Sequence, residues 1–93
     1  MDIRKLQKAR NKVDKIDMQI FYLIKKRTLI VKHMLKLKKY KKQIVDHKRI
    51  NLILKKIRKK SLINNIDPII TNKIWKSMIW SYVNFQRRNF KKK

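Results

Sequence analysis

Four residues of this 93-residue chain lie where solvated polar side chains are not expected. At 100° per residue, Arg27 lies at the centre of the apolar stripe of a helix, and Lys38 returns to that face within about 20°. Gln86 shares a largely apolar face of a later helix, where a buried amide requires hydrogen-bond partners. Arg49 falls in the first turn of the second helix, where a cation opposes the helix dipole. Together these residues predict a small cationic pocket inside a helical bundle.

A pocket of this kind is expected to bind an anion. Buried guanidinium and ammonium groups are costly without anionic partners, and the chain has 5 acids, all Asp, against 29 Lys plus Arg. Asp17, about 80° around the helix from Arg27, is one candidate partner. We expect an anionic ligand to complete the pocket, with an arginine forked onto a carboxylate. The alternative is that Arg27 and Lys38 extend their charged ends to the surface.

The composition excludes several other kinds of chemistry. The chain has no Cys, which removes disulfides, thiolate metal sites and thiol nucleophiles, and no Gly, which removes Gly-rich phosphate loops. His33 and His47 lie fourteen residues apart with few carboxylates nearby, so neither a metal site nor a cofactor is expected.

A long first helix must position Arg27 and Lys38. The segment from Ile3 to Lys39 contains neither Pro nor Gly and is periodic throughout. At 1.5 Å per residue such a helix is about 50 Å long, whereas a compact domain of this size has a radius of gyration near 13 Å. Its apolar stripe therefore needs a partner, and an intertwined homodimer is expected. The stripe consists of Val13, Ile16, Ile20, Leu23, Val31 and Met34.

Two further helices are expected after a polar break at residues 39–45. Asp46 is a plausible N-cap of a second helix that ends around residues 61–65. Asp67 and Pro68 read as N-cap and first residue of a third helix, which runs to about Asn89. We therefore predict an all-α fold of three helices in one domain, residues 1–93, with a fraying basic tail at about 87–93. On the third helix the inward stripe with Gln86 comprises Trp75, Ile79, Tyr82, Val83 and Phe90.

The formal net charge of +24 allows two interpretations. Residues with A/T-rich codons dominate, with 22 Lys, 15 Ile and 7 Asn, so gene composition accounts for much of the basic bias. This favours a solvated lysine coat. The other interpretation is an electrostatic footprint, and the rival function is a basic helical nucleic-acid-binding protein. Lysines are spread around every polar face, so nucleic acid is not expected as the partner.

No segment resembles a signal peptide, because the start of the chain alternates charged and apolar residues. The apolar runs are far shorter than the roughly 20 residues of a membrane-spanning helix. We therefore expect a cytoplasmic protein without a membrane partner.

The ordered spacing of these residues resembles the all-helical chorismate mutase family. The resemblance extends from about Leu6 to Phe90 and rests on Arg10–Asp17, Arg27, Lys38, Asp46, Arg49 and Gln86. It implies an intertwined homodimer of three-helix chains with two active sites. The implied activity is conversion of chorismate, a small dianion, to prephenate in aromatic amino acid biosynthesis, without a cofactor.

The resemblance also implies a role for each residue. Arg27, and Arg10 from the partner chain, would grip the substrate carboxylates. Lys38 would contact a carboxylate and the ether oxygen, and Gln86 would donate to the same ether oxygen. Asp46 and Arg49 would close the pocket at the start of the second helix.

One position departs from the mutase pattern. Typical members place a Glu directly after the second-helix Arg to hold the ring hydroxyl, but this chain has Ile50 there. Ile50, together with Tyr82 four residues before Gln86, resembles the isochorismate-pyruvate lyase branch, which forms salicylate and pyruvate. We favour the mutase and keep the lyase as the alternative.

Overall fold

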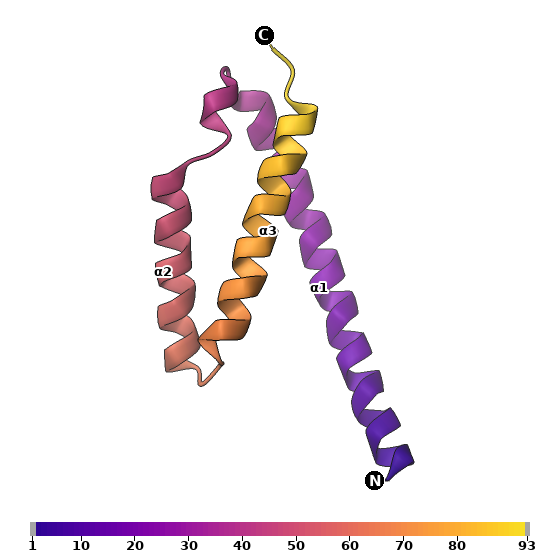
Figure 1. The fold of residues 1–93 in the computed structure, drawn as a ribbon. Coiled ribbons are helices and arrows are strands. Elements are labelled where there is room, and N and C mark those ends of the chain that lie inside the picture. Colours follow the sequence, from indigo (N-terminus) through magenta and orange to yellow (C-terminus); the bar gives the residue numbers. More distant parts are fainter. Residues whose placement is uncertain (1, 93) are drawn as a thin grey trace. The chain divides into compact units, whose positions relative to one another are not determined.

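The computed structural model describes residues 2–92 and shows helices and no strand over that range. The elements are α1 (Ile3–Leu37), a short 3₁₀ turn η1 (Lys41–Gln43), α2 (His47–Ile63) and α3 (Pro68–Asn89) (Figure 1). The expected all-α fold with a long first helix is thus confirmed. None of the helices in the described range is long and apolar enough to cross a membrane.

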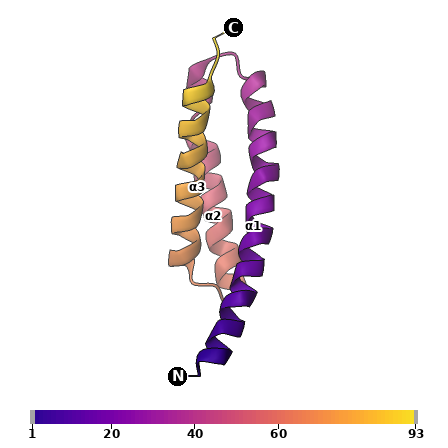
Figure 2. The ribbon, with the colours of Figure 1, turned by 90° about the vertical axis from the view of Figure 1, so that its right-hand side faces the viewer.

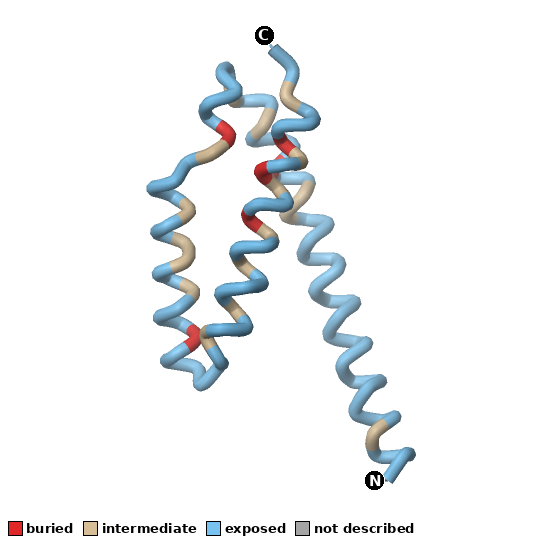
Figure 3. The backbone as a smooth tube through the Cα atoms, viewed as in Figure 1, coloured by how far each residue is buried: buried red, intermediate tan, exposed pale blue. Residues whose placement is uncertain are grey.

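The chain divides into two units, with the boundary inside α1 after Val31. The first unit is a single stretch of helix, and the Asp2 carboxylate caps it by accepting the backbone N–H groups of Arg4 and Lys5 at 3.0 and 3.2 Å. A helix alone cannot bury its apolar face, and nearly all residues of this stretch are exposed (Figure 3). Most of its large apolar side chains are among them. These are Ile3, Val13, Ile16, Met18, Ile20, Phe21, Tyr22, Leu23, Ile24, Leu29 and Ile30.

The second unit is built on an antiparallel hairpin of α2 and α3, which lie side by side in both views (Figures 1 and 2). The predicted caps form, because the Asp46 carboxylate accepts the Arg49 N–H at 3.0 Å and the Asp67 carboxylate accepts the Ile69 N–H at 2.9 Å. Between the helices, Asn65 has a φ of 56°. Asn tolerates this left-handed conformation better than most residues, so the chain turns there without Gly.

The core of the second unit lies mainly along α3. Ile79 and Val83 are buried on the predicted stripe with Gln86, and Trp75 and Tyr82 are half-buried. At the turn end of the hairpin, the Ser61 and Thr71 hydroxyls are 2.7 Å apart, and Ser61 also donates to the Ile57 carbonyl. A buried hydroxyl is thereby satisfied. Ile44, within the expected polar break, is also buried, which the sequence did not predict.

Two predicted boundaries were wrong by a few residues. α1 ends at Leu37 rather than Lys39, so Lys38 is the first residue beyond the helix. At the other end, Arg87–Asn89 belongs to α3, and only residues 90–92 of the expected tail are non-helical in the described range. The remaining tail residue, Lys93, lies outside the described residues.

Candidate active site

Lys38 and Gln86 are in direct contact. The Lys38 ammonium donates a hydrogen bond of 2.7 Å to the Gln86 side-chain oxygen, joining the end of α1 to the last turns of α3. Gln86 is only 7 % exposed and Lys38 is half-buried. A hydrogen bond from a cation in such a setting is stronger than a neutral one. The sequence placed each residue on an inward face, and the structure shows that they meet.

Hydrogen bonds in the turn after α1 fix the position of the Lys38 backbone. The Lys38 N–H still bonds to the Leu35 carbonyl at 3.2 Å. The Gln43 side-chain oxygen then accepts the N–H groups of Lys39 and Tyr40, both at 2.8 Å, so the backbone cannot continue the helix. Gln43 was not among the residues that the sequence predicted for the site. Its only signal was an amide side chain within reach of the free N–H groups of a chain leaving a helix.

The Gln86 amide is held in a defined orientation. Its oxygen faces the Lys38 ammonium, so its NH₂ group is the donor left for other partners. In this structure the Gln86 NH₂ group donates to the Tyr82 carbonyl one turn earlier, at 3.3 Å. That bond is long for N–H···O, so a better acceptor could replace it.

The position of Lys38 changes its acid–base behaviour. Burial lowers the pKa of Lys38 from its ordinary value of 10.5, because the ammonium loses solvation, and the Asp46 carboxylate partly opposes this by raising the pKa. A charge that is less solvated acts more strongly on a neighbouring group. Lys38 is therefore suited to interact with negative charge on a bound molecule.

The start of α2 presents three more candidate residues. Asp46 caps the helix with its carboxylate, and its backbone carbonyl accepts the Ile50 N–H at 3.0 Å. Asp46 and Arg49 are exposed, and Ile50 is half-buried. The structure therefore groups Asp46 electrostatically with Lys38 and puts an apolar side chain at position 50.

The remaining two candidates, Arg10 and Arg27, belong to the first unit. Arg10 is exposed, and Arg27 is half-buried on a helix whose other side chains are mostly exposed. The structure brings the Lys38 and Gln86 side chains into contact, with the Tyr82 backbone carbonyl as a further partner of Gln86 and the Asp46 carboxylate acting electrostatically on Lys38. Arg10 and Arg27 are not grouped with them.

The chemistry available in the second unit is electrostatic. A half-buried ammonium and an oriented amide can stabilise negative charge that develops on a bound anion. Over residues 2–92, no group of three or more His, Cys, Asp or Glu side chains is arranged to hold a metal ion.

Comparison with known proteins identifies the family of the chain. The family model described as chorismate mutase type II matches residues 9–87, which is most of the chain. No curated protein and no solved structure gives a significant match.

Proposed function

Because the chain belongs to the chorismate mutase type II family and is a chorismate mutase, we propose that Lys38 and Gln86 carry its catalysis. The rearrangement of chorismate to prephenate is pericyclic and needs no nucleophile, general base or metal. As the bond from the ether oxygen to the ring lengthens, that oxygen gains negative charge. Groups that stabilise this charge more than the ground state accelerate the reaction.

The observation that carries the proposal is the 2.7 Å contact between the Lys38 ammonium and the Gln86 oxygen. Because the Gln86 oxygen accepts this bond, the Gln86 NH₂ group is left as a donor close to the ammonium, so the two donors could converge on one oxygen atom of a substrate. The weak 3.3 Å bond from Gln86 to the Tyr82 carbonyl is the interaction that substrate would replace. Preorganised donors of this kind require little rearrangement during the reaction.

The substrate carboxylates are assigned to arginines. Arg27 and Arg10 are proposed to bind them, since a guanidinium fork matches a carboxylate with two parallel hydrogen bonds. Arg49 and Asp46, at the exposed start of α2, are proposed to close the pocket. Holding the enolpyruvyl side chain folded over the ring supplies the orientational part of catalysis.

A second copy of the chain is proposed to complete each site. Arg10 and Arg27 are 17 residues apart on α1, which is about 26 Å along the axis and about 100° around it. One small dianion cannot bridge that distance, so Arg10 would serve the site of the partner chain. The exposed apolar side chains of the first unit supply the surface that a second copy would cover.

Ile50 is the observation that favours a second candidate function. Its half-buried side chain offers no acceptor for a ring hydroxyl where a typical mutase has a carboxylate. With Tyr82, it is compatible with elimination of pyruvate from isochorismate.

Separate incubations of the purified protein with chorismate and with isochorismate test which of the two reactions it catalyses. We expect prephenate from chorismate, detected by loss of chorismate absorbance and by acid conversion of prephenate to phenylpyruvate. Faster formation of salicylate and pyruvate from isochorismate would instead assign the chain to the lyase reaction. No turnover of either substrate would contradict both functions.

A further inference from the structure

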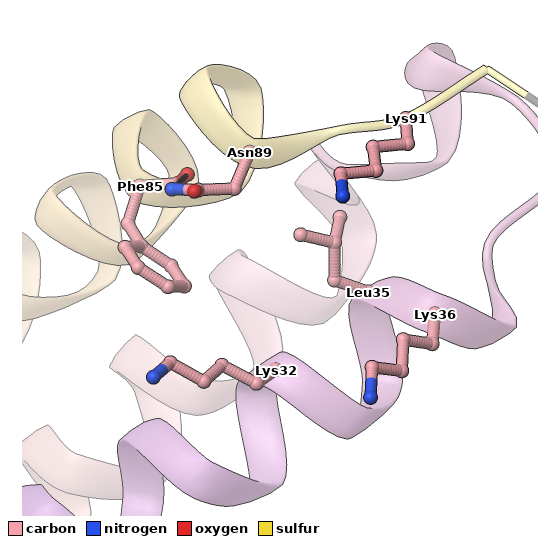
Figure 4. Close-up of a pocket in the computed structure, with 6 residues that line it drawn as sticks. All are labelled: Lys32, Leu35, Lys36, Phe85, Asn89 and Lys91. Carbon is pink, nitrogen blue, oxygen red and sulfur yellow. Dashed lines mark hydrogen bonds between the residues drawn. The ribbon is translucent and has the colours of Figure 1, made fainter.

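A separate cavity of about 350 Å³ lies within the second unit, between the last turns of α1 and α3. Lys32, Leu35, Lys36, Phe85, Asn89 and Lys91 line it (Figure 4). None of these six residues belongs to the proposed active site. The volume falls within the range of small-molecule pockets.

The charge of the lining points to an anionic ligand. Lys32, Lys36 and Lys91 contribute three ammonium groups, and the lining contains no carboxylate. Like charges around one space repel each other, and a bound anion relieves that repulsion. Each ammonium is carried on a flexible four-carbon stem, so the three can turn towards a shared ligand.

The other walls suit a flat apolar body with one polar end. Phe85 and Asn89 line the cavity from α3, and Leu35 reaches into it from α1 (Figure 4). Phe85 and Leu35 are half-buried, so they already form a firm apolar surface. The Asn89 NH₂ group donates to the Phe85 carbonyl at 2.8 Å, which leaves its side-chain oxygen as an acceptor for a ligand hydroxyl.

We propose that this cavity is a second ligand site, which binds a small aromatic carboxylate. The ring lies between Leu35 and Phe85, the carboxylate faces the lysines, and a ring hydroxyl donates to Asn89. A second copy of the chain is a poor occupant of the cavity itself, because the chain has only 5 acidic side chains to pair with the three lysines of the lining. The proposal does not depend on which reaction the active site catalyses.

Titration of the ¹⁵N-labelled protein with 4-hydroxybenzoate, followed by NMR, tests this site. We expect saturable shifts of the Asn89 side-chain amide and the Phe85 backbone amide, with a Kd below about 1 mM. Lys36→Ala and Lys91→Ala should each raise Kd about fivefold, because each removes a charge-assisted contact. Lys56→Ala, which removes an exposed lysine of α2 outside the cavity, is the matched control and should change Kd less than twofold.

The neutral analogue 4-hydroxybenzamide separates a carboxylate site from a merely apolar one, and we expect it to bind about tenfold more weakly. Equal binding of the amide would overturn the proposal. So would the largest shifts appearing at the Gln86 side chain, an equal effect of Lys56→Ala, or shifts that do not saturate.

Discussion

Lys38 combines a partly desolvated ammonium with a fixed hydrogen-bond partner. It is half-buried, which lowers its pKa, and its ammonium is fixed by a 2.7 Å hydrogen bond to a buried amide. Burying part of a charged group is costly, and charged groups with shifted pKa values are concentrated at functional sites. At this scale the proposed chemistry depends on the protonated form of one side chain.

The lowered pKa predicts how activity depends on pH. The charged form is required, so kcat/KM should fall as pH rises through the pKa of Lys38, at a pH below the 10.5 of an ordinary lysine. Lys38→Arg keeps the charge at high pH, so this loss should disappear from its pH profile. Profiles of kcat/KM between neutral and alkaline pH measure both effects. A fall of equal midpoint in Lys38→Arg would assign it to another group.

Position 50 predicts a gain of function. Ile50→Glu restores an acceptor for the ring hydroxyl at the start of α2, and we expect kcat/KM for chorismate to rise severalfold. Ile53→Glu, also half-buried and one turn later, is a matched control for placing a carboxylate on this helix. The conversion rate of chorismate measures both. A loss of rate in Ile50→Glu as large as that in Ile53→Glu would show that the pocket does not place a hydroxyl there.

At the scale of elements, α2 and α3 begin in the same way but should differ in function. Asp46 and Asp67 each cap a helix through one carboxylate hydrogen bond. Only Asp46 also acts on the charge of Lys38. One cap therefore supports the fold and the proposed site, whereas the other supports the fold.

This difference gives a matched pair of variants. Asp46→Ala and Asp67→Ala should each lower the free energy of unfolding by about 1 kcal/mol, but only Asp46→Ala should reduce kcat/KM. Asp46→Asn retains a capping oxygen and removes the charge, so it should spare stability and move the alkaline loss of activity to lower pH. Urea unfolding and pH–rate profiles check these outcomes. Equal loss of activity in both alanine variants would make Asp46 purely structural.

Sequence predicted the elements best where short-range chemistry determines them. Asp46, Asp67 and Pro68 mark helix starts through local hydrogen bonds and a fixed φ, and the structure confirms those starts. The predicted end of α1 was wrong because the true end depends on Gln43, whose side chain accepts hydrogen bonds from the N–H groups of Lys39 and Tyr40. Periodicity placed Lys38 and Gln86 on inward faces, but their contact spans 48 residues and required the fold. The lysine-lined cavity could not be predicted, because tertiary packing brings its two helix ends together.

At the scale of the whole molecule, the exposed apolar surface of the first unit leads us to expect that two copies of the chain associate. Eleven large apolar side chains between Ile3 and Ile30 are exposed. Burial of such surface is the main favourable term in association. Two copies arranged about a twofold axis would each lend Arg10 to the other's site.

Complementation between chains tests that arrangement. Arg10→Ala and Arg27→Ala homodimers should both be nearly inactive, because each site lacks one carboxylate-binding arginine. Refolding the two variants together in equal amounts should restore about a quarter of wild-type activity, since half of the dimers are mixed and each has one intact site. Activity of the refolded mixture measures this, with each variant refolded alone as the control. No recovery in the mixture, with mixed dimers confirmed by mass spectrometry, would place Arg10 in the site of its own chain.

The turnover of Lys38→Ala tests the central proposal most directly. Removing one donor to a developing negative charge should lower kcat for chorismate by about 10²–10³-fold, with the helical circular dichroism spectrum unchanged. Lys39→Ala removes the neighbouring exposed side chain but keeps the N–H that bonds to Gln43, so it should keep wild-type turnover. Wild-type turnover in a folded Lys38→Ala variant would contradict the assignment of catalysis to the Lys38–Gln86 pair.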